Sequence, residues 1–152
     1  MLSIGDAAPD FTLPTDNGGS VTRSELAGRS VVLYFYPKDD TSGCTKEACD
    51  FRDAAPDFNA VNAIVIGVSP DNPKKHDAFK AKHGLPFKLA SDEEKTTLEA
   101  YGVWVEKSMY GRKYMGVERS TFLIGPDGTL QAIWRKVKVP GHVEAVRKAL
   151  AD

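Results

Sequence analysis

Two long apolar runs, rich in β-branched and aromatic residues, constrain the fold of this 152-residue chain more than any other feature. They are Val31 to Tyr36 and Ala63 to Val68. Continuous runs of this kind are typical of strands that are buried on both faces of a sheet. Pro37 ends the first run, because proline has no amide proton for a strand ladder. A separation of about thirty residues between the runs predicts a right-handed parallel β-α-β crossover.

The segment between the two runs predicts a polar loop followed by a helix. The loop covers Lys38 to Gly43, and Ser42 is the candidate N-cap. We expect Pro56 to bend or restart the helix near its far end. Small or apolar residues recur at helical spacings of three and four at Cys44, Ala48, Phe51 and Ala55.

The rest of the chain predicts further elements around this unit. In chain order these are a hairpin of 11–13 and 21–22, a helix at 72–83, a strand at 87–90, a helix at 93–101, a surface excursion at 103–118 near the active site, a hairpin of 120–124 and 130–135, and a helix at 142–150. An N-terminal β-α-β unit and a C-terminal β-β-α unit around one sheet form a thioredoxin-like arrangement. We therefore expect a single α/β domain over residues 1–152, with a central mixed β-sheet flanked by helices and an N-terminal β-hairpin extension.

Charge and hydropathy narrow the functional classes. Lys and Arg number 20, Asp and Glu number 21, and no basic block stands out, which argues against a nucleic-acid partner. No apolar run approaches the roughly 20 residues that cross a bilayer, so we expect no membrane association. Met1 to Asp10 lacks a basic segment followed by an apolar stretch of signal-peptide length, which predicts a cytoplasmic protein.

The chain has two cysteines, Cys44 and Cys49, and three histidines, at 76, 83 and 142. Their spacing does not match a four-ligand zinc site, so we expect no metal. The cysteines are then redox-active, catalytic or incidental. We expect all three histidines to be solvated residues rather than catalytic bases.

Cys44 is the candidate nucleophile. It lies where a loop leaving a buried strand enters a helix, and the free amides and positive dipole end of a helix start favour a thiolate. Thr41 precedes it by three residues, so its hydroxyl can reach the sulfur or a molecule bound to it. Pro37 can shield the floor of the pocket without adding a competing donor.

The spacing of Pro37, Thr41 and Cys44 resembles the active-site signature of the peroxiredoxins, and 43–53 resembles their peroxiredoxin Q branch, also called bacterioferritin comigratory protein. The resemblance implies a thioredoxin-like fold and a cysteine-based peroxidase without metal, haem, flavin or any other cofactor. It covers nearly the whole chain, through the segments 5–11, 65–69, 118–124 and 134–139.

The resemblance also implies roles for individual residues. Cys44 is then the peroxidatic cysteine and Cys49 the resolving one, with Arg119 as the pocket arginine. Hydrogen peroxide and organic hydroperoxides are the implied substrates, in antioxidant defence. The sulfenic acid of Cys44 condenses with Cys49 to an intramolecular disulfide, which thioredoxin or a similar dithiol reduces, so we expect a monomer.

Peroxide cleavage needs donors for both oxygens. Arg119 can supply a charge and several N–H groups, and Thr41 with the backbone amides of Gly43 and Cys44 completes the set. Glu47 lies on the same helical face as Cys44. The sequence leaves open whether Glu47 orients Arg119 by a bidentate pair or is an exposed carboxylate.

Two other functions share these features. A thioredoxin-type disulfide oxidoreductase has the same fold, but ordinarily two residues separate its cysteines, whereas four separate Cys44 and Cys49. A non-enzymatic binding protein that senses redox state is the other alternative.

Residues five apart on a helix have Cα atoms about 8 to 9 Å apart, whereas a disulfide needs about 4.4 to 6.8 Å. The implied disulfide therefore requires the start of the helix to unwind.

Overall fold

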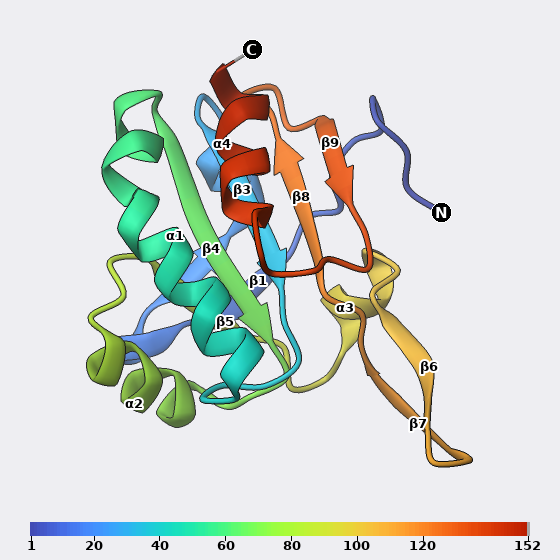
Figure 1. Ribbon diagram of the computed structural model, residues 1–152. Coiled ribbons are helices and arrows are strands. Elements are labelled where there is room, and N and C mark those ends of the chain that lie inside the picture. Colours follow the sequence, from blue (N-terminus) through green and yellow to red (C-terminus); the bar gives the residue numbers. More distant parts are fainter. Residues whose placement is uncertain (152) are drawn as a thin grey trace.

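The computed structural model describes residues 1–151 and is built around a five-stranded sheet of order β5-β4-β3-β8-β9 (Figure 1). β3 pairs in parallel with β4 and β4 with β5, whereas β8 is antiparallel to both β3 and β9. The mixed sheet and the parallel crossover are thus as predicted. The strands are β3 (Ser30–Phe35), β4 (Ala63–Ser69), β5 (Lys88–Ser91), β8 (Ser120–Ile124) and β9 (Leu130–Trp134).

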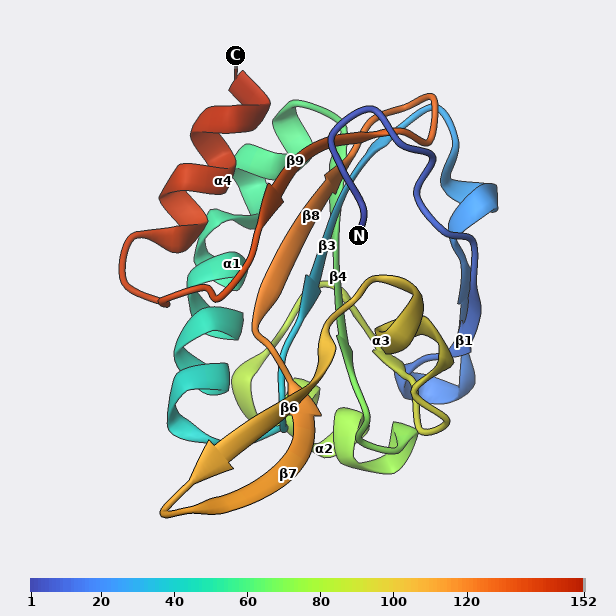
Figure 2. The ribbon, with the colours of Figure 1, turned by 90° about the vertical axis from the view of Figure 1, so that its right-hand side faces the viewer.

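Helices α1 (Ser42–Ala60) and α4 (His142–Ala151) cover one face of the sheet, and α3 (Thr96–Ala100) lies on the other with the N-terminal hairpin (Figure 2). That hairpin pairs β1 (Thr12–Pro14) with β2 (Ser20–Thr22). The remaining elements are α2 (Pro73–His83), the hairpin of β6 (Trp104–Met109) and β7 (Arg112–Val117), and the short 3-10 helices at Asp16–Gly18 and Arg23–Leu26.

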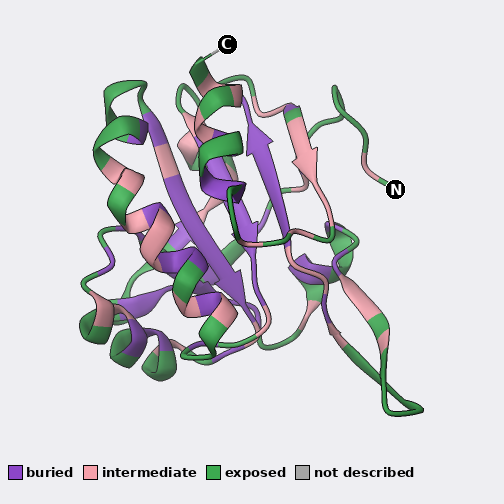
Figure 3. Ribbon diagram, in the orientation of Figure 1, coloured by how far each residue is buried: buried purple, intermediate pink, exposed green. Residues whose placement is uncertain are grey.

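The sheet separates two apolar clusters. Its inner strands β3, β4 and β8 are almost wholly buried (Figure 3). Side chains of β3 alternate between the two clusters: Val32 and Tyr34 pack with α1 and α4, whereas Leu33 and Phe35 pack with Tyr101 and the N-terminal hairpin. β3 is therefore buried on both faces, as its continuous apolar run predicted.

Three helix boundaries differ from the sequence prediction. Thr41, not Ser42, is the N-cap residue of α1, and the helix continues through Pro56 to Ala60 instead of restarting there. α3 begins at Thr96 instead of Glu93, because Lys95 has a left-handed backbone (φ 65°). Asn72 does cap α2, since its side chain accepts a hydrogen bond from the amide of Lys75 at 2.9 Å. None of the described helices is long and apolar enough to span a membrane.

Candidate active site

Strand register brings two segments that are far apart in sequence to one end of the sheet. β3 ends at Phe35, and the loop after it leads into α1. Phe35 pairs with Ser120 of the antiparallel β8. Arg119, immediately before β8, therefore lies beside the loop and the start of α1.

Cys44 lies in the first turn of α1 and is only 2% exposed. The first helical hydrogen bond runs from the amide of Thr45 to the carbonyl of Thr41 at 2.8 Å. The preceding amides, including those of Gly43 and Cys44, have no intrahelical acceptor and form the positive end of the helix dipole. These amides can donate to an anion that develops at or beside the sulfur.

Arg119 contacts the sulfur directly. Its Nη2 donates to Sγ of Cys44 at 3.3 Å. Gly43 leaves room for this contact, because a Cβ there would lie 3.2 Å from the same Nη2. Burial lowers the pKa of Arg119, but Glu47 and Cys44 outweigh that effect and raise it above its ordinary value. Arg119 is thus a permanent cation at the sulfur.

Glu47 is the second partner of Arg119, and it is fully buried, which excludes the exposed carboxylate left open by the sequence. Nη1 of Arg119 donates to Oε1 of Glu47 at 2.6 Å. The pair is also not the bidentate one that was the other possibility left open by the sequence. Nη2 of Arg119 is directed at Cys44, and Oε2 of Glu47 has no hydrogen-bond partner among the described residues. Burial raises the pKa of Glu47 to about 7 against the opposing influence of Arg119.

Thr41 and Pro37 lie between β3 and α1, and among the described residues the Thr41 hydroxyl makes no hydrogen bond to the sulfur; its predicted contact with a molecule bound at the sulfur stays a prediction. The Thr41 hydroxyl instead donates to the carbonyl of Lys38 at 2.9 Å. Thr41 is exposed and Pro37 half-buried. The Thr41 hydroxyl thus bonds within the loop, and the Thr41 carbonyl accepts the first hydrogen bond of α1.

Cys49 is half-buried on the same helix as Cys44, and both are free thiols. Five residues of regular helix place their Cα atoms about 8 to 9 Å apart. This separation exceeds the reach of a disulfide. The helix holds the two sulfurs apart, as expected for the reduced protein.

The β6–β7 hairpin contributes a second cation, Lys107, whose charge interacts with that of Arg119. Burial and the charge of Arg119 lower the pKa of Lys107 on β6, while Cys44 opposes that shift. The aliphatic stem of Lys107 packs across Gly116 of β7, where a Cβ would lie 3.3 Å from its Cδ. The segment expected as a surface excursion is thus a β-hairpin that carries the half-buried Lys107 on its first strand.

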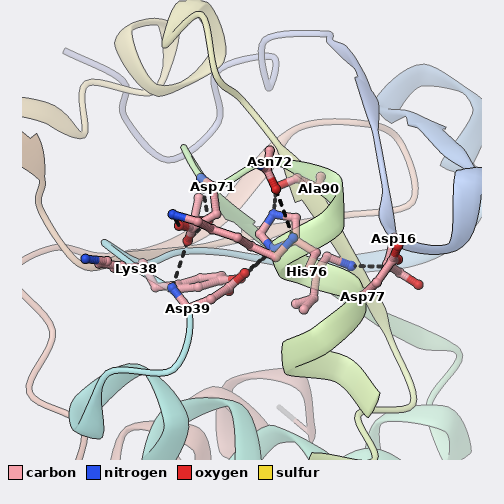
Figure 4. Close-up of polar contacts among 12 residues, drawn as sticks. Asp16, Lys38, Asp39, Asp71, Asn72, His76, Asp77 and Ala90 are labelled. Carbon is pink, nitrogen blue, oxygen red and sulfur yellow. Dashed lines mark hydrogen bonds and ion pairs between the residues drawn. The ribbon is translucent and has the colours of Figure 1, made fainter. Parts of the chain in front are cut away.

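Two histidines were wrongly predicted to be solvated. His142 is buried, its Nε2 lies 2.7 Å from Oγ1 of Thr121, and burial together with Arg119 lowers its pKa to about 4. His76 is fully buried and contacts Asp39 of the loop between β3 and α1 (Figure 4). The spacing of His76 and Phe79 on α2, three residues apart, was the available signal that both face inward.

Comparison with known proteins gives one consistent answer. Residues 4–133 match the AhpC/TSA family. The chain is 52% identical over 145 residues to a putative peroxiredoxin Bcp of Coxiella burnetii, covering 95% of this chain and 96% of the relative. It is also 52% identical over 151 residues to peroxiredoxin Bcp of Bacillus subtilis, covering 99% and 96%.

A solved structure of the bacterioferritin comigratory protein of Xanthomonas campestris, described for its alkyl peroxide reduction activity, superposes with a TM-score of 0.91. The two are 44% identical, and the match covers 99% of this chain and 96% of that one. The thioredoxin-like fold and the peroxiredoxin resemblance predicted from the sequence are confirmed. The chain belongs to the AhpC/TSA family and is a thiol-dependent peroxidase of the peroxiredoxin Q/Bcp type.

Proposed function

We propose that Cys44 is the peroxidatic cysteine of this peroxidase and Cys49 its resolving cysteine. The observation that carries the first assignment is the 3.3 Å contact from Arg119 to Sγ of Cys44 in the first turn of a helix. Cys49 has no comparable cation contact among the hydrogen bonds and ion pairs of the described residues. The two thiols are therefore chemically distinct, although they share a helix.

In the first step the Cys44 thiolate attacks one oxygen of a hydroperoxide. The O–O bond breaks, the sulfur becomes a sulfenic acid, and the other oxygen leaves as water or an alcohol after taking a proton. Arg119 and the amides of Gly43 and Cys44 stabilise the charge on the departing oxygen. Pro37 and the loop carrying Thr41 limit access of water to the sulfur.

In the second step the Cys49 thiol gives up its proton and attacks the sulfenic sulfur, the S–O bond breaks, and the departing hydroxide takes up a proton to leave as water, which completes a Cys44–Cys49 disulfide. The helix must unwind around Glu47 for the sulfurs to meet. A dithiol, which we propose is thioredoxin, then reduces the disulfide and restores both thiols. A monomer suffices for this cycle because both cysteines belong to one chain.

The test is peroxide-dependent NADPH consumption with thioredoxin and its reductase. We expect Cys44→Ser to abolish both turnover and the first oxidation. Cys49→Ser is the matched control: it should still form the sulfenic acid in a single turnover but lose thioredoxin-dependent cycling. Turnover by Cys44→Ser would overturn the assignment of the peroxidatic cysteine.

Three further expectations stay predictions: that residues 1–152 act as one domain, that the protein is a monomer, and that it is cytoplasmic. Limited proteolysis, sedimentation at micromolar concentration and cell fractionation test them in turn. A stable dimer in sedimentation would contradict the second.

A further inference from the structure

A buried polar network lies directly behind the loop that leads to Cys44 (Figure 4). Its centre is Asp39, whose two carboxylate oxygens are both bonded: Oδ1 accepts from the Tyr36 hydroxyl at 2.5 Å, and Oδ2 lies 2.6 Å from Nδ1 of His76. The amide of Asp39 donates to Oδ2 of Asp71 at 2.7 Å, and Ser69 donates to the same oxygen at 2.8 Å. The loop is therefore tied to α2 and to the end of β4.

The hydrogen-bond partners of His76 show which of its ring nitrogens must carry a hydrogen. Nε2 of His76 faces the carbonyl oxygen of Ala90 at 3.0 Å, and a carbonyl only accepts, so Nε2 carries a hydrogen. Nδ1 faces Oδ2 of Asp39, and one proton lies between these two atoms whichever of them holds it. With both histidine nitrogens engaged, His76 bridges the loop to β5.

The loop needs such an anchor. Asp40 has a left-handed backbone with φ 62°, a conformation that is uncommon for residues other than glycine, although aspartate adopts it more readily than most. The side chain of Asp40 is exposed and paired with Lys82, so it supplies little restraint. The buried restraint is at the preceding residue, Asp39.

The anchor also determines where Cys44 lies. The Thr41 carbonyl accepts the first hydrogen bond of α1, so the position of the loop sets the first turn that presents Cys44 to Arg119. His76 and Ala90 belong to α2 and β5, outside the segment between Cys44 and Cys49 that must unwind. The anchor can persist while α1 changes.

We propose that His76 is a positioning residue for the peroxidase reaction, which through Asp39 holds the loop of residues 37–41 in register with Arg119. The proposal rests on the assignment of Cys44 as the peroxidatic cysteine. It predicts that loss of the His76–Asp39 bond slows attack on peroxide, which needs Arg119 and the helix amides in register with the loop, much more than it slows alkylation of the thiol, which does not need those donors aligned with a peroxide.

Two substitutions of His76 separate its two bonds. In His76→Asn the side-chain amide can take the place of Nδ1 and donate to Asp39, whereas in His76→Gln it can take the place of Nε2 and donate to Ala90. Two rates are measured for each variant: single-turnover oxidation of Cys44 by hydrogen peroxide, and alkylation of Cys44 by iodoacetamide. The ratio of the two rates reports positioning, because a loosened fold changes both.

We expect His76→Gln to lower the peroxide rate about 10- to 100-fold, the usual effect of a misplaced reacting group, and to leave alkylation within about twofold. His76→Asn should restore most of the peroxide rate. A peroxide rate that is unchanged in His76→Gln, or that falls only in proportion to alkylation, would overturn the proposal.

A second pair of variants, both at Asp39, tests the proposal if the His76 variants fail to fold. Asp39→Asn can accept from Tyr36 and donate to Nδ1 of neutral His76, whereas Asp39→Ala removes the anchor. We expect a low ratio of peroxide rate to alkylation rate only in Asp39→Ala, and equal ratios in the two variants would overturn the proposal. The peroxide reactivity of unsubstituted Cys44, measured first, tests the proposed function separately.

Discussion

Two buried pairs of a carboxylate and a cationic or imidazole partner flank Cys44, and they differ in how completely their hydrogen bonds are made. In the pair of Asp39 and His76, both carboxylate oxygens and both ring nitrogens have partners. In the pair of Glu47 and Arg119, Oε2 of Glu47 has none, and the guanidinium is divided between the carboxylate and the sulfur.

The difference indicates which side of the site changes during turnover. A buried polar atom without a partner costs free energy, so a rearrangement that supplies one is favoured. Glu47 lies between the two cysteines, in the segment that must unwind, whereas Asp39 lies before the helix. We therefore expect the contacts of Glu47 with Arg119 to change during turnover and those of Asp39 with His76 to stay in place.

The largest effect is expected from Arg119. Arg119→Met should slow the reaction of Cys44 with peroxide about 100- to 1,000-fold, because a preorganised donor to the developing anion is lost. Arg119→Lys is the matched control, because lysine keeps the charge but not the planar guanidinium. Its rate with peroxide should lie between those of the wild type and of Arg119→Met. Circular dichroism checks that the fold is kept. An unchanged peroxide rate in Arg119→Met would remove this pair from the reaction.

Glu47→Gln should change how stability depends on pH. The pKa of Glu47 in the folded protein is about 7, above its ordinary value of 4.5, so its favourable contribution is present below pH 4.5 and is lost as pH rises through 7. The rise in the pKa of Glu47 corresponds to a loss of about 3 kcal/mol of folding stability as its carboxyl group ionises. The variant does not titrate there, so its stability relative to the wild type should increase over that range in denaturant unfolding. A constant difference from pH 4.5 to 8 would contradict the assigned ionisation.

Oxidation should affect the two pairs differently. With a Cys44–Cys49 disulfide confirmed by mass, we expect amide hydrogen exchange at Thr45 to Asp50 to become about tenfold faster or more, because those helical bonds are lost. Exchange at the amide of His76 in α2 should stay the same. Equal protection of Thr45 to Asp50 in the two redox forms would rule out the unwinding.

The smallest effect is expected from Asn72→Ala. It removes the N-cap of α2 and should cost about 1 kcal/mol of stability. The His76–Asp39 bond lies one turn further along and is kept, so the rate with peroxide should not change. A slower reaction would mean that general loosening of α2, not the specific bond, controls the loop.

The sequence predicted the sheet well because its signals are local. The apolar run of β3 and the Asn72-Pro73 start of α2 carry their structure in a few neighbouring residues. Cys44 at a helix start was predictable for the same reason. The contact with Arg119 was available only from the family resemblance, since it joins residues 75 positions apart.

The failures have a common physical origin. Burial of His76 and His142 follows from how helices pack on the sheet, and the polar character of these side chains hides it in a sequence pattern. For the same reason the sequence left the burial of Glu47 open. For Thr41 the spacing allowed a contact with the sulfur or with a molecule bound to it, and the structure shows its hydroxyl bonded to the Lys38 carbonyl instead of to the sulfur. Competition between nearby acceptors cannot be decided without coordinates.

The pairing of Phe35 with Ser120 affects when the site can form during synthesis and folding. Synthesis proceeds from the N-terminus, so the cysteine-bearing helix emerges well before Arg119 and β8. Until β8 pairs with β3, Cys44 lacks the contact with Arg119 that it has in the folded protein. The site is therefore assembled only when the sheet is nearly complete, although its cysteine and its arginine are made at very different times.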